Sequence, residues 1–152
     1  MLLTLLSAVA LLLGTHYFIH RSVVFAFDVT GRRARVTLLL VFVSLAVSIP
    51  LAMALHRFDG NAITRTAHTL SSVWLGLALH LVLFLALGWV AHGVSRLLGR
   101  PIAARAALVA AVVLSLSASS FGLWNAHHPI VTLLEVEIDE LPESWEGRTV
   151  VQ

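Results

Sequence analysis

Four long apolar stretches constrain the fold of this chain more than any other feature. They cover residues 2–19, 36–55, 70–91 and 106–124, and none contains Asp, Glu, Lys or Arg. Stretches of this length can cross about 30 Å of hydrocarbon as α-helices, which rise about 1.5 Å per residue. A charge at the bilayer centre costs roughly 3 kcal/mol, so the absence of charge favours membrane insertion. The sequence predicts an all-α membrane protein with four transmembrane helices in residues 1–126.

The composition excludes other classes of protein. Hydrophobic residues make up 59% of the 152 positions and charged residues 12%, against about 45–50% and about 25% in soluble domains. Intrinsic disorder needs low hydrophobicity and high net charge, which is the opposite balance. The chain has no cysteine, so disulfides, thiolate metal sites and cysteine nucleophiles are excluded. All ten basic residues are arginine, which suggests a GC-rich, bacterial genome.

A cleaved signal peptide is the alternative interpretation of the first stretch. Such a peptide has a basic segment before its apolar core and a small-residue cleavage site followed by polar sequence. Residues 1–19 have neither a basic start nor such a continuation. We therefore expect residues 2–19 to remain in the protein as a membrane helix.

The distribution of arginine predicts the orientation of the helices. The first and third loops carry seven arginines and the second loop carries two: Arg21, Arg32, Arg33, Arg35, Arg96, Arg100 and Arg105 against Arg57 and Arg65. Short loops rich in arginine stay in the cytoplasm. We expect both termini to lie outside the cytoplasm, with the chain in the bacterial inner membrane.

Small residues recur every four positions in the fourth stretch, which places them on one helix face. Ala107, Ala111, Ser115 and Ser119 continue a series that begins at Ala103. Helices in lipid associate through close approach of small residues. We expect this face to pack against another helix rather than to line a pore.

Similar but weaker pairs of small residues occur in two other stretches. Ser72 and Gly76 form such a pair in the third stretch, and Ala10 and Gly14 form one in the first. In the second stretch, Pro50 removes one backbone hydrogen bond and predicts a kink.

Eight histidines raise the question of a metal site or a proton relay. His56, His68 and His92 fall in or beside loops, where a solvated ring is the simpler interpretation. His16 and His20 share a helix face at a predicted membrane boundary, and His127 and His128 follow the fourth stretch.

Only His80 falls in the middle of an apolar stretch. There a hydrogen bond to a neighbouring helix is favoured over transport or catalysis. Three tryptophans, Trp74, Trp89 and Trp124, lie near predicted helix ends, as in an aromatic belt at the membrane surface.

The segment after the fourth stretch has a different character. Residues 129–152 carry six acids and one arginine. Leu134, Val136 and Ile138 alternate with Glu135, Glu137 and Asp139, which predicts a half-buried strand with one solvated face. A second strand is expected over residues 148–152, after a connection containing Pro142 and Gly147. Residues 127–152 therefore predict a short β-strand or hairpin-like tail outside the cytoplasm, the start of a larger domain.

These residues resemble a known family. The segment has, in order, a helix ending in Asn125-Ala126, a proline at 129, an alternating strand, Leu141-Pro142, and then Gly147-Arg148 before a β-branched strand ending in Gln152. This order resembles the lead-in to the catalytic domain of bacterial membrane-anchored, calcineurin-like metallophosphoesterases. Their anchors often have about four helices, and the first ends in an aromatic and basic segment similar to residues 16–21.

The resemblance implies a function whose catalytic residues are not in this sequence. In the family, the second strand leads into a Ser-Asp-x-His segment, and its Asp and His bind two divalent metal ions in a full-length enzyme. No such segment occurs in residues 1–152, so the sequence offers no catalytic, cofactor-binding or metal-binding residue.

Three interpretations follow from these features. The first is the anchor region of a phosphoester hydrolase, inactive by itself. The second is a small four-helix membrane protein whose acidic tail docks a partner by adding a strand to a sheet edge. The third and weakest is a histidine-dependent carrier. In all three the lipid bilayer is the surrounding partner, and no nucleic-acid-binding surface is present.

Overall fold

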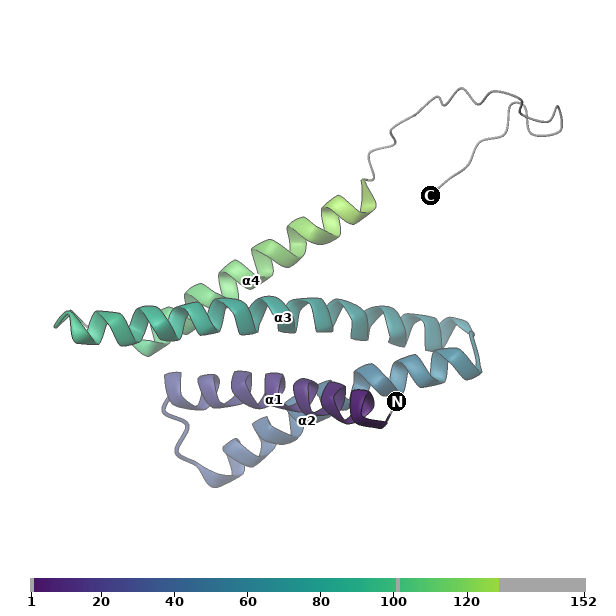
Figure 1. The fold of residues 1–152 in the computed structure, drawn as a ribbon, viewed down its shortest axis with the longest axis horizontal. Coiled ribbons are helices and arrows are strands. Elements are labelled where there is room, and N and C mark those ends of the chain that lie inside the picture. Colours follow the sequence, from purple (N-terminus) through teal and green to yellow (C-terminus); the bar gives the residue numbers. More distant parts are fainter. Residues whose placement is uncertain (1, 101, 129–152) are drawn as a thin grey trace, which may run out of the picture.

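The computed structural model describes residues 2–100 and 102–128, and these residues form four α-helices without a strand. The helices are α1 (Leu2–Ala26), α2 (Arg32–Phe58), α3 (Ala62–Leu97) and α4 (Ala104–His127), joined by short loops (Figure 1). The prediction of four helices is confirmed. The predicted tail strands at residues 134–138 and 148–152 lie outside the described residues.

All four helices are long and apolar enough to cross a membrane. Many of their large apolar side chains point outward: Leu40 is 61% exposed, Leu79 57% and Val113 55%. Apolar surface of this extent would promote aggregation in water, but lipid tails cover it without penalty. The fold is that of an integral membrane protein.

Each helix is longer than the apolar stretch that predicted it, and α1 shows why. It continues past Ile19 through Arg21 and ends at Ala26. There Asp28 adopts a positive φ of 48°, and the Val29 amide donates to the Val24 carbonyl over 3.0 Å. This left-handed cap stops the helix, because it satisfies a carbonyl of the last turn and redirects the chain. The helix therefore extends beyond the apolar stretch of residues 2–19, because the cap ends it and the loss of hydrophobicity does not.

The other turns use local signals of the same kind. Gly99, with φ of 71°, follows the end of α3, and the Arg100 amide donates to the Ser95 carbonyl over 3.0 Å. Asn61 caps the start of α3, because its side-chain oxygen accepts from the Thr64 amide over 3.0 Å. α2 continues through Pro50 to Phe58.

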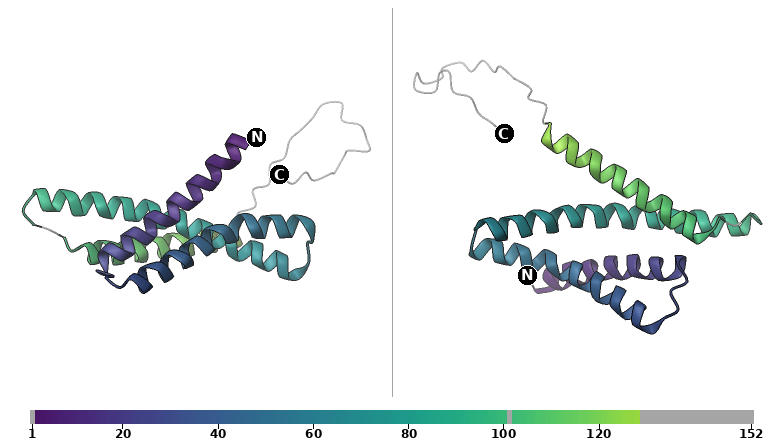
Figure 2. Two further views of the ribbon diagram at one scale, coloured as in Figure 1. Left: turned by 90° about the horizontal axis from the view of Figure 1, so that it is seen from below. Right: turned by 180° about the vertical axis from the view of Figure 1, so that it is seen from behind.

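The helices run up and down, and α3 contacts each of the other three. α1 also contacts α2 and α4, whereas α2 and α4 do not touch each other within the described residues. α4 crosses α3 near its own start and then diverges from it (Figures 1 and 2). Accordingly, every residue from 120 to 128 is exposed.

The two ends of the bundle differ in charge. The loop between α1 and α2 and the loop between α3 and α4 lie at one end, together with the seven arginines that the sequence places in these loops. We name it the arginine-rich end. The opposite end holds the turn from α2 to α3, the start of α1 and the end of α4.

A small apolar core joins α1, α3 and α4. It is a single cluster of buried residues: Ile19, Ala78, Leu81, Leu85, Leu108 and Ala111. α2 adds Phe42 at the margin of this cluster. The core therefore sits where α4 crosses α3 and where α1 covers both.

The small-residue face of α4 lies against this core. Ala111 is 2% exposed and Ser115 is fully buried. The closest approach is at Gly88 of α3, where an added Cβ would lie 3.4 Å from the Ala107 carbonyl oxygen. The weaker pairs behave differently, because Gly76 and Gly14 have no neighbour within 4 Å of such a Cβ. In this fold the expected packing at those two glycines is not formed.

Candidate functional site

Polar side chains of α1 are buried against α3 although both helices are largely apolar. His16 is 1% exposed, and its Nε2 accepts a hydrogen bond of 2.9 Å from Nε1 of Trp74. Its other nitrogen, Nδ1, lies 2.8 Å from the Leu12 carbonyl oxygen. Because a carbonyl can only accept and an indole N–H can only donate, the proton of His16 sits on Nδ1 and the ring is neutral.

A second pair repeats this arrangement closer to the arginine-rich end. Nε1 of Trp89 donates to the Ser22 hydroxyl oxygen over 2.9 Å, and Ser22 in turn donates to the Phe18 carbonyl over 2.9 Å. Ser22 is 2% exposed. His16 and Ser22 each donate their proton to a carbonyl of α1 and accept a hydrogen bond from a tryptophan of α3, so both side chains are engaged in joining the helices.

These two pairs correct the sequence analysis. His16 lies inside α1 and not at its end, so His80 is not the only histidine in the middle of a membrane helix. Trp74 and Trp89 are inner residues of the long helix α3, and their indole groups point to α1. Their observed role is to join helices. Trp124, 66% exposed and stacked on His128, is the one of the three that keeps a position near a helix end.

His20 joins α1 to the start of α2. It is 6% exposed, and its Nε2 lies 3.2 Å from the Arg35 carbonyl oxygen. The ring of Phe42 meets it edge-on, and the ring of Tyr17 stacks on it. Its Nδ1 is buried and has no hydrogen-bond partner among the described residues. The ring is held by these aromatic contacts.

The pair His80 and Ser119 connects α3 with α4, as the prediction for His80 required. The distance from Nδ1 of His80 to the Ser119 hydroxyl oxygen is 3.1 Å. The same Nδ1 lies 2.9 Å from the Gly76 carbonyl oxygen. Since that carbonyl can only accept, Nδ1 carries the proton and cannot remove one from Ser119. The pair has the residue types of a nucleophile and its base, but its protonation state excludes that chemistry.

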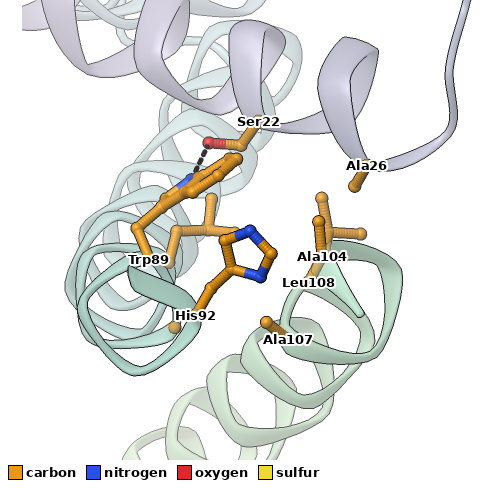
Figure 3. A pocket seen from close by; sticks show the side chains of 9 residues that line it. Ser22, Ala26, Trp89, His92, Ala104, Ala107 and Leu108 are labelled. Carbon is orange, nitrogen blue, oxygen red and sulfur yellow. Dashed lines mark hydrogen bonds between the residues drawn. The ribbon is translucent and has the colours of Figure 1, made fainter. Parts of the chain in front are cut away.

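A small pocket of about 10 Å³ lies between α1, α3 and α4, towards the arginine-rich end. Figure 3 shows the Trp89–Ser22 hydrogen bond on one side of it, and the ring of His92 between α3 and α4. Nδ1 of His92 lies 2.6 Å from the Ile102 carbonyl oxygen, which orients the ring. The other walls are apolar: Ala26, Leu85, Gly88, Ala104, Ala107 and Leu108. The pocket has room for about one water molecule and is too small for a substrate.

The remaining histidines lie away from this pocket. His56 and His68 face each other across the turn from α2 to α3, with ring centroids 5.2 Å apart. Both rings are half-buried, so they are only partly exposed beside this turn. His127 and His128 bond to carbonyls of their own helix through Nδ1. Among residues 2–100 and 102–128, no group of three or more His, Asp or Glu side chains could hold a metal ion together.

Several hydroxyl groups in the helices also have hydrogen-bond partners within the protein. Ser7, Thr15, Ser72 and Ser115 each donate to the carbonyl four residues earlier in their own helix. Such bonds satisfy polar groups in a bilayer that offers no water. These side chains are therefore accounted for by helix structure.

Comparison with known proteins adds no family to this description. No family model matches the chain, and neither a curated protein nor a solved structure matches it significantly. The resemblance of residues 125–152 to metallophosphoesterases therefore stays a prediction.

Proposed function

We propose that residues 2–128 are the membrane anchor of a calcineurin-like metallophosphoesterase, whose catalytic domain follows α4. The observation that supports an anchor is how the bundle uses its buried polar groups. His16 and Ser22 are bonded to tryptophans of α3, and His80 is bonded to Gly76 and Ser119. Groups that hold helices together in this way stabilise a scaffold and leave none of these side chains free to bind a substrate.

The divergence of α4 agrees with this role. Its first half packs on α3, but residues 120–128 are exposed and lead away from the bundle (Figure 1). Because the end of α4 lies apart from the other helices, the chain that follows it begins at a distance from their ends. A water-soluble domain attached there has room above the membrane surface.

The proposed orientation puts this domain outside the cytoplasm. The arginine-rich end faces the cytoplasm by the positive-inside rule. The end of α4 lies at the opposite end of the bundle, with the start of α1. Two divalent ions and the family's Asp and His ligands would belong to the following domain, where metal ions stabilise both the attacking and the leaving oxygen of a phosphoester.

The nucleotide sequence beyond codon 152 is the first test. An in-frame segment encoding Ser-Asp-x-His directly after Gln152 would support the proposal. A stop codon at that position would contradict it and favour the alternative, a small membrane protein that docks a partner through the acidic residues 135–140.

The second test is biochemical. Residues 1–152 in detergent should not hydrolyse a generic phosphodiester with Mn²⁺, whereas a chain extended by the natural reading frame should do so. Replacing the Asp of the downstream Ser-Asp-x-His segment by Asn is the matched control, and it should abolish turnover without detaching the protein from membranes. Metal-dependent turnover by residues 1–152 would refute the proposal.

A further inference from the structure

Two imidazole rings from different helices meet at the end of the bundle opposite the arginines. His56 lies in the last turn of α2, and His68 lies in the second turn of α3. Their ring centroids are 5.2 Å apart and their planes are inclined by 30°. The tight turn at residues 59–61 brings the two helices together here, and Asn61 holds it by capping α3.

One nitrogen of this pair has no partner. Nδ1 of His56 is buried and makes no hydrogen bond to any described residue. A buried polar atom without a partner is destabilising, and native proteins rarely keep one without a reason. By contrast, Nδ1 of each of the histidines His16, His80, His92, His127 and His128 has a carbonyl oxygen within 3 Å. Nδ1 of His20 is also buried without a partner among the described residues, but the rings that contact His20 are those of Tyr17 and Phe42. The His56 ring therefore differs from the others by an unused nitrogen beside a second imidazole.

The separation of the rings suits a shared metal ion. A zinc ion lies about 2.0–2.1 Å from a coordinating histidine nitrogen. The ion then stands about 3.2 Å from each ring centroid, and a tetrahedral angle at the ion separates the centroids by about 5.2 Å. The observed separation of 5.2 Å equals this value.

We propose that His56 and His68 together bind one divalent transition-metal ion beside the turn between α2 and α3. Imidazole ligands select zinc, copper and nickel over magnesium and calcium. Among the described residues, no third histidine or acidic side chain is placed to join them. The ion ties the end of α2 to the start of α3. This site is separate from the two-metal centre expected in a following catalytic domain, and does not depend on the proposed function.

Zinc titration of the detergent-purified 152-residue chain tests the site. The wild-type chain should bind one Zn²⁺ that His56→Gln and His68→Gln each weaken by more than about tenfold, because loss of a ligand costs at least as much as loss of a second-shell contact. The double variant His127→Gln/His128→Gln is the matched control. It removes two exposed histidines at the same end of the bundle and should keep the site.

The results that would overturn the proposal are equally definite. The proposal fails if the wild-type chain binds no zinc, or if zinc binding survives either single substitution. It also fails if zinc binding is lost only in the control variant. Copper spectroscopy gives a readout that leaves both proposed ligands, His56 and His68, in place. Cu²⁺ added at one equivalent to the control variant should show two imidazole nitrogens in its electron paramagnetic resonance spectrum. Fewer than two nitrogens would refute a site shared by the pair.

Discussion

The indole N–H of Trp74 donates to Nε2 of His16 over 2.9 Å, and this bond links residues 58 positions apart on α3 and α1. The His16 ring is almost fully buried and has its second nitrogen bonded to Leu12. In lipid there is no hydrophobic force between helices, so specific hydrogen bonds and close packing decide which faces meet. This bond fixes how α1 rotates about its own axis against α3.

Replacing Trp74 by Phe should destabilise the bundle by about 0.5 to 2 kcal/mol, because the ring is largely kept while the donor to His16 is lost. Unfolding in mixed detergent measures the change. A double-mutant cycle with His16→Leu should give a coupling energy of similar size. Trp124→Phe, at an exposed position, is the control. Additive effects of the two substitutions would show that the bond contributes nothing.

Replacing Ala111 by Leu should lower stability by on the order of 1 to 3 kcal/mol, because the larger side chain has no space in the core between α3 and α4. Ala110→Leu adds the same atoms on the exposed neighbouring position and should have little effect. Thermal unfolding in detergent compares the two. Equal melting temperatures for both variants would mean that the Ala111 face looks at lipid.

Gly88 offers a graded test of how closely α3 and α4 approach. An alanine there would meet Ala107 at 3.4 to 3.8 Å, which is ordinary contact, so Gly88→Ala should be tolerated or gain up to about 1 kcal/mol of helix propensity. Gly88→Leu should push α4 away and destabilise the bundle by about 1 to 3 kcal/mol. Gly93→Leu, on the same helix in open space, serves as the comparison. A Gly88→Leu variant as stable as Gly93→Leu would contradict the close approach.

The proposed orientation predicts the behaviour of reporter fusions. Green fluorescent protein exported unfolded to the periplasm stays dark, so a fusion after His128 should not fluoresce, whereas alkaline phosphatase at the same site should be active. Fusions at Gly99, in the loop between α3 and α4, should show the reverse pattern. Fluorescence after His128 would invert the topology.

Much of the fold could be predicted from the sequence. Four charge-free apolar stretches specify four helices, because the bilayer accepts only segments whose backbone groups bond internally. The series from Ala107 to Ser119 identifies the packing face of α4 for the same reason, since small residues permit close approach. Helix ends were predicted less well. They depend on caps such as Asp28 and Gly99, and hydropathy does not register the φ angle of a single residue.

The partners of the polar residues were decided only by the tertiary structure. A histidine followed by an aromatic residue in α1 gives no sign that Trp74 will reach it, because the pairing depends on how two long helices rotate and cross. The same holds for Ser22 with Trp89, and for His56 with His68 across the α2–α3 turn. One-dimensional periodicity places a residue on a face of its own helix. Which face of which neighbour it meets follows from packing over the whole bundle, and that packing converts isolated polar residues into interhelical bonds.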